Sequence, residues 1–210
     1  MKCESLGLYP NGFIIKATNT EYAKKFITPK WPFNYYGIEG DNWPIDSYSE
    51  NITSDVVNFI NDFIYENVEN MDEYEKSIDV CVDLDFINYY IENCKKANLD
   101  IDILFVETEL DSPRYPINLE ADERFEFIGF DYAFPVQDYF SAIYQNYKII
   151  SKFSGFRLNK FGLFDIEEEV IKYKVTRHEI IDTHPDIHLE PGQFVIYKIW
   201  RYIGQIPLTK

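Results

Sequence analysis

Hydrophobic and aromatic positions recur with a clear period in several stretches of the chain. Ile101–Thr108 reads IDILFVET, a β-branched run that predicts a strand, and Gln193–Ile203 predicts a second strand near the C-terminus. Thr53–Val68 has apolar residues every three to four positions, which predicts an amphipathic helix. Leu84–Ala97 predicts another helix, and Asp165 is expected to cap a further helix that ends near residue 180.

The most aromatic stretch, Arg124–Tyr147, changes from a strand pattern to a helix pattern. Its first part predicts a strand that breaks at Asp131. Pro135 excludes a continuing strand, because proline cannot donate a ladder hydrogen bond. Asp138 is then expected to cap a short helix over Tyr139–Tyr147. We expect this stretch to lie at the centre of the hydrophobic core.

Turn signals complete the predicted fold. Pro10–Asn11–Gly12 predicts a β-hairpin that joins Glu4–Tyr9 to Gly12–Ala17, because Asn-Gly is the strongest short hairpin signal. Ser77–Val82 predicts a further strand before the helix of residues 84–97. No repeat, linker or low-complexity tract interrupts the chain. The sequence therefore predicts a single α+β domain over residues 1–210, with a largely antiparallel sheet of about five or six strands and three or four packed helices.

Chain length and cysteine usage narrow the class of protein. A chain of 210 residues, with 17 Tyr and 17 Phe, is long enough to bury a hydrophobic core without covalent cross-links. Cys3, Cys81 and Cys94 show no CxxC spacing, which argues against a disulfide framework and a zinc site. No leader pattern and no membrane-length apolar window is visible. We expect a cytoplasmic protein that makes no membrane contact.

The charge is strongly acidic and unevenly placed. The chain has 36 acids and 20 bases, a net charge of −16. Residues 39–92 contain 15 of the acids and one base, Lys76. A field of this sign repels nucleic acid and anionic lipid, and it favours a basic protein partner, because complementary charge speeds association and fixes its register. The alternative is a solvated surface that only keeps the protein soluble.

A partner-binding face is predicted within this acidic span. Four acids on the helix of residues 53–68 and just beyond it are spaced by seven, four and three positions, which places them on one stripe. The preceding loop, residues 31–48, has two tryptophans that either anchor an interface or cover the edge of the core. The predicted partner-binding residues are Asp55, Asp62, Glu66, Glu69, Trp31, Trp43, Asp41 and Asp46.

Three histidines lie close together near the C-terminus. His184 and His188, with a nearby carboxylate, could ligate a divalent metal, and His178 lies six residues before His184. Pro185 disfavours a helical pairing of the two ligands, and no HExxH pattern is present. We expect a polar loop there, with no metal and no cofactor.

Two carboxylate pairs are candidates for acid–base or magnesium chemistry. Asp83 with Asp85 and Asp100 with Asp102 lie at predicted strand ends, where the sites of α/β enzymes gather. Both pairs also flank a predicted helix, where capping and solvation explain them. The chain has none of the short motifs of phosphate-binding loops or nucleophilic hydrolases. We therefore expect no catalytic residues, and an enzyme that uses these Asp pairs or the His loop ranks third.

One segment carries a resemblance to a known group of proteins. FIGFDYAFPVQDYFSAIYQNY, followed by LNKFGLF, resembles a pattern in immunity proteins of bacterial polymorphic toxin systems. The resemblance covers about 30 residues and is architectural, so no functional residue is carried over. It implies a cytosolic inhibitor that occludes the active site of a toxin.

Charge and resemblance together rank two binding functions first. The leading one is an immunity protein that neutralises a basic toxin, for example a nuclease, whose active site must be positive to hold phosphate. The alternative is a nucleic-acid mimic that inhibits a defence complex, as in phage anti-defence or anti-CRISPR proteins. Direct binding of nucleic acid by the chain itself is not expected.

Overall fold

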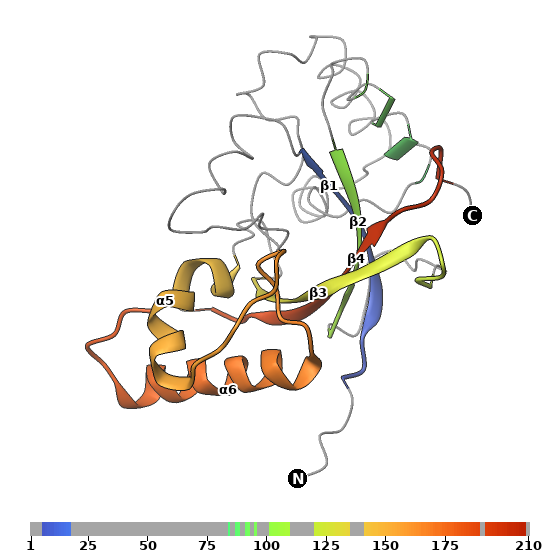
Figure 1. The fold of residues 1–210 in the computed structure, drawn as a ribbon. Coiled ribbons are helices and arrows are strands. Elements are labelled where there is room, and N and C mark those ends of the chain that lie inside the picture. The colour runs from blue at the N-terminus through green and yellow to red at the C-terminus, as the bar shows by residue number, and fades with distance from the viewer. Residues whose placement is uncertain are drawn as a thin grey trace, which may run out of the picture.

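The computed structural model describes residues 6–17, 84, 87, 88, 91, 92, 95, 101–109, 120–134, 141–189 and 192–208. Within these ranges, four strands form an antiparallel sheet in the order β1-β2-β4-β3, and two long helices lie beside β3 (Figure 1). The elements are β1 (Tyr9–Ala17), β2 (Ile101–Thr108), β3 (Phe125–Ala133), α5 (Ala142–Ser154), α6 (Glu167–Thr183) and β4 (Val195–Tyr202). The α+β class and the antiparallel sheet are confirmed.

The described elements are fewer than the predicted ones. Two complete helices are described, against the three or four that the sequence predicts. The predicted helix of residues 53–68 and the predicted strand of residues 77–82 lie outside the described residues. The described positions between Leu84 and Lys95 are helical, and Ile87 and Ile91 are fully buried, as the predicted helix of residues 84–97 requires.

The predicted N-terminal hairpin is wrong. Tyr9–Ala17 is one continuous strand that pairs with β2 from Tyr9↔Thr108 to Ala17↔Ile101. The register shifts between Pro10 and Gly12, and Gly12 has a φ of 154°. The Pro-Asn-Gly sequence therefore forms a bulge instead of a reversal, because a long antiparallel partner satisfies the backbone on both sides of it.

The central stretch also differs from its prediction. β3 does not break at Asp131 but continues to Ala133. The buried Asp131 carboxylate accepts hydrogen bonds from its neighbour Tyr132 N (2.8 Å) and from Ser141 Oγ (2.6 Å), so a polar residue is tolerated inside the strand. Ser141 Oγ in turn accepts a bond from Ile143 N (3.1 Å) and caps α5. The predicted cap, Asp138, lies outside the described residues.

The helix that follows is displaced along the chain. It was expected over residues 139–147, whereas α5 begins at Ala142 and ends at Ser154. Tyr147, expected to be its last residue, lies in its interior and donates from Oη to Phe156 O (2.6 Å). The pattern predicts the helix but not its bounds: α5 ends at Ser154, where Gly155 follows with a φ of 63° and donates to Ser151 O (2.9 Å), as glycines that end helices do.

Buried side chains cover both faces of the sheet. One face carries a cluster that includes Leu104, Val106, Tyr197 and Ile199, closed by Leu163 from the loop after α5. On the other face, α5 and α6 cover β3 through a second cluster, whose aromatic members are Phe130, Tyr132, Phe156, Phe164, Tyr173 and Phe194. A third cluster stacks Phe13, Phe105 and Phe125 under the helical residues near 87–91. Aromatic burial is thus the main content of the core.

Asn159 organises the loop between α5 and α6. Its Oδ1 accepts hydrogen bonds from Phe161 N (2.8 Å) and Leu163 N (3.2 Å), and its Nδ2 donates to Ile128 O of β3 (2.8 Å). Gly162 N donates to Asn159 O (3.1 Å) and closes a turn in which Gly162 has a φ of 78°. The Asn159 amide therefore helps to hold the loop to the outer edge of β3, together with the paired backbone hydrogen bonds of Phe130 and Phe164.

The predicted cap of α6 is wrong. Ile166 occupies the N-cap position and makes no side-chain cap bond. Asp165 Oδ1 instead accepts from Asn159 Nδ2 (2.8 Å), so its carboxylate belongs to the loop. The first turn of α6 holds three acids, Glu167–Glu169, which complement the positive end of the helix dipole.

Candidate functional site

The eight predicted partner-binding residues lie outside the described residues. They are Asp55, Asp62, Glu66, Glu69, Trp31, Trp43, Asp41 and Asp46. Their mutual geometry is therefore not tested, and the partner-binding face stays a prediction.

The described residues carry only a small part of the net negative charge of the chain. They contain 16 acids and 12 bases, a net charge of −4, against −16 for the whole chain. The segment that holds α5 and α6, residues 141–189, has seven acids and seven bases and is neutral. The sheet and its two covering helices thus form a nearly neutral scaffold, and three quarters of the net charge belongs to other parts of the sequence.

A buried arginine is the most unusual feature of this scaffold. Arg177 is fully buried, and its guanidinium carbon lies 4.2 Å from the centre of the Phe194 ring. It occupies the inward stripe of α6 together with Val170, Tyr173 and Ile180. Arg177 is not among the candidate residues that the sequence predicts. The missed signal was its spacing, since it falls four positions after Tyr173, three before Ile180 and seven after Val170.

Two tyrosines share this buried region. Tyr132 and Tyr173 meet edge to face, with ring centres 6.3 Å apart. Burial raises the pKa of Tyr132 to about 12 and the pKa of Tyr173 well above its usual value, and the charge of Arg177 opposes both rises. Tyr173 Oη donates to Ala142 O (2.8 Å), whereas Tyr132 Oη has no hydrogen-bond partner in the part of the chain that the structure describes.

We expect the two hydroxyls to have opposite effects on stability. Tyr132→Phe removes a buried hydroxyl that makes no hydrogen bond and should raise the free energy of unfolding by about 1 kcal/mol. Tyr173→Phe removes the bond to Ala142 O and should lower it by about 1 kcal/mol. Urea unfolding of both variants measures the difference. If Tyr132→Phe destabilises as much as Tyr173→Phe, the Tyr132 hydroxyl has a partner and this description of the region is wrong.

Two glutamates tie β2 to β4 and α6 on the helix side of the sheet. Glu107 Oε2 accepts from Trp200 Nε1 (2.7 Å) and lies 3.5 Å from Lys198 Nζ. Glu109 Oε1 pairs with Lys174 Nζ of α6 at 2.6 Å. All these groups are partly buried and mutually satisfied, so they act as cross-links of the scaffold. Trp200, the tryptophan that the sequence reasoning did not consider, is part of this arrangement.

The candidate metal ligands are not brought together. His178, His184 and His188 are all exposed. The His184 ring meets the Phe153 ring edge to face at 5.1 Å, and its Nδ1 lies 2.7 Å from Thr183 Oγ1. Among the described residues, no group of three or more His, Cys, Asp or Glu side chains is arranged to hold a metal ion. The predicted polar loop at residues 184–192 is confirmed over its described positions.

Of the four aspartates in the two carboxylate pairs, the structure describes one. Asp102 is partly buried in β2, whereas Asp83, Asp85 and Asp100 lie outside the described residues. The enzyme hypothesis that rests on these pairs therefore stays a prediction.

An open groove lies between the end of α5 and the outer side of α6. Its volume is about 390 Å³. Phe153, at 45% exposure, forms one wall, and the groove contains both a cation and a carboxylate. The lining residues are Phe153, Ser154, Lys172, Thr176, Glu179, Ile180, Thr183 and His184. None of these residues was considered as a binding residue from sequence except His184.

In the described ranges, neither α5 nor α6 is long and apolar enough to cross a membrane.

Comparisons with known proteins identify no family for this chain. No family model, no curated protein and no solved structure matches this chain.

Proposed function

We propose that this protein is an acidic inhibitor that binds a basic protein partner in the cytoplasm. Immunity to a bacterial toxin, for example a nuclease, is the leading case. The proposed whole fold is one α+β domain of five or six strands and three or four helices, with the acidic span of residues 39–92 as its binding part.

The observation that carries this proposal is that most of the net negative charge belongs to residues outside the described scaffold. Charge added only for solubility is usually interspersed over a surface in both signs. Here the described residues have 16 acids and 12 bases, whereas residues 39–92 have 15 acids and one base, and the two sets share a single charged residue, Glu92. A block of one sign beside a nearly neutral scaffold favours a surface that selects a partner of opposite charge.

The proposed contact residues combine charge with aromatic anchors. Asp55, Asp62, Glu66 and Glu69 supply the attraction, Trp31 and Trp43 supply buried contact area, and Asp41 and Asp46 lie between them in the sequence. Large aromatic residues surrounded by polar groups are the usual energetic centre of a tight protein interface.

Reversal of four charges tests the proposal. We expect Asp55→Lys, Asp62→Lys, Glu66→Lys and Glu69→Lys together to weaken capture of a basic partner on the order of 100-fold, because like charges face each other across the interface. The measurement is affinity purification from the native host at low and moderate salt, followed by titration of the captured protein. Equal amounts of one basic toxin domain are expected with the unchanged protein.

A matched control has the same change in net charge at described, exposed positions. Glu168→Lys, Glu179→Lys, Asp182→Lys and Asp186→Lys should leave capture within about threefold. Equal loss with both sets would show that only net charge matters, and no loss with the first set would remove the proposed face. Release of the captured protein by added DNA would favour the nucleic-acid mimic instead.

A further inference from the structure

The end of α5 carries a cationic surface that the acidic function does not use. Ser141–Phe164 contains four bases and no acid, in a chain with a net charge of −16. Lys148 and Lys152 lie one turn apart on α5 and are exposed, as are Arg157 beyond the helix and Lys172 on α6. None of these four forms a salt bridge in the part of the chain that the structure describes.

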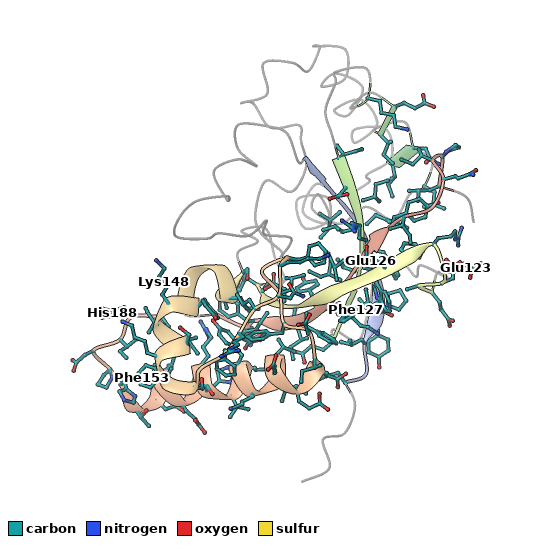
Figure 2. All side chains as sticks on the ribbon, viewed as in Figure 1. Glu123, Glu126, Phe127, Lys148, Phe153 and His188 are labelled. Atoms are coloured by element: carbon teal, nitrogen blue, oxygen red, sulfur yellow. The ribbon has the colours of Figure 1, made fainter. Side chains whose placement is uncertain are left out.

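These cations surround one region instead of being scattered. Tyr147 Oη of α5 donates to Phe156 O (2.6 Å), which holds the chain at the neighbouring Arg157 close to the helix. Lys172 Nζ lies 5.5 Å from the centre of the Phe156 ring and lines the groove beside Phe153. Lys148 lies at the middle of α5 and Phe153 near its C-terminal end, and both are labelled in Figure 2. The same helix thus carries the exposed Phe153 ring and two exposed lysines, Lys148 and Lys152.

An exposed aromatic ring among cations has a specific chemical use. Phe153 is 45% exposed, and its ring meets the His184 ring edge to face at 5.1 Å. A flat base can stack on such a ring, while neighbouring cations contact the phosphates on either side of it. The groove, at about 390 Å³, falls within the size range of small-molecule sites, and its hydroxyls and Glu179 can bond the polar edge of a base.

We propose that this surface binds single-stranded nucleic acid, with one base on Phe153 and the backbone along Lys152, Lys148 and Arg157. The proposal is separate from the acidic inhibitor function and does not depend on it. The overall negative charge does not prevent such binding, because charges further away than about 8 Å are largely screened at physiological salt. An acidic peptide would also meet the cations, but it would not use the exposed ring.

Fluorescence anisotropy with a labelled 12-residue oligouridylate tests the proposal on the full chain. We expect saturable binding at 50 mM salt, with a log–log salt slope of about −2 to −3, as three or four phosphate contacts predict. Phe153→Ala should weaken binding about 10-fold, the loss of one stacked base, and Lys152→Glu should weaken it at least as much. Circular dichroism checks that each variant is folded.

The matched controls are an exposed lysine and an exposed apolar residue elsewhere. Lys95→Glu and Ile203→Ala should each leave the affinity within about twofold, because both side chains are exposed outside the groove. Absence of binding at 50 mM salt would overturn the proposal. Equal affinity for polyglutamate, or no effect of Phe153→Ala, would also overturn it, because the contact would then be a charge effect without stacking.

Discussion

Gly129→Ala is expected to lower the free energy of unfolding by about 3 to 5 kcal/mol, from overpacking and backbone strain together. A Cβ at this position would lie 2.5 Å from Leu163 Cβ and 2.8 Å from Phe164 O, and the latter is backbone that cannot move alone. Its φ of +142° adds strain for any residue with a side chain. Gly129 follows the bulge in β3, where the Asn159 loop touches the strand.

Urea unfolding measures this effect, and a second glycine provides the control. Gly155 also has a positive φ, +63°, but a Cβ there would meet nothing within 4 Å. Gly155→Ala should therefore cost only the backbone term, about 1 to 2 kcal/mol. If the two variants are equally destabilised, the close approach of the loop to β3 is not as the structure shows.

Arg177→Ala is expected to destabilise the fold by a similar amount, about 3 to 5 kcal/mol. The change removes a fully buried side chain, its stacking on Phe194 and the charge that faces Tyr132 and Tyr173. A void would remain between α6 and the sheet, because close-packed surroundings relax only in part.

Arg177→Met separates volume from charge. Methionine fills most of the space without a charge, and it should recover about half of the loss, because burying an apolar chain needs no compensating bonds. His178→Ala, at the exposed neighbouring position, should change the free energy of unfolding by less than about 0.5 kcal/mol. A methionine variant no more stable than the alanine variant would falsify the packing argument.

The parts of the fold that the sequence predicted are those with strong local signals. β2 was predicted at its exact bounds, because IDILFVET is bounded by polar residues and rich in β-branched ones. β4 lies within its predicted range, and the helical positions near Ile87 agree with the apolar period. The prediction of a single domain stays a prediction.

The errors share a physical cause, which is that long-range contacts outweighed local signals. The Asn-Gly turn at residues 11–12 is absorbed as a bulge because β2 pairs along the whole strand. Asp131 does not end β3 because Ser141, ten residues away, satisfies its carboxylate. Neither contact leaves a trace in the few residues around it, so a local pattern could not reveal them.

The candidate site could be predicted from sequence only as a distribution of charge. The acidic span was visible directly, whereas its geometry depends on residues outside the described ranges. Residues 148–177 contain seven bases and four acids, and this net positive charge is all that the sequence shows of the cationic surface near Phe153. Its ring and its groove depend on how α5 meets α6, and this crossing of two helices has no sequence signature.

The loop after α5 also affects the tendency of the protein to aggregate. Phe130 exchanges both backbone hydrogen bonds with Phe164 (2.8 and 3.0 Å), so the outer edge of β3 is already occupied at its centre. An exposed strand edge is a template for pairing with other chains, and a covered edge is not. A change that detaches this loop, such as Asn159→Ala, would expose an aromatic edge while most of the core remains folded. Such a protein would aggregate before it unfolds.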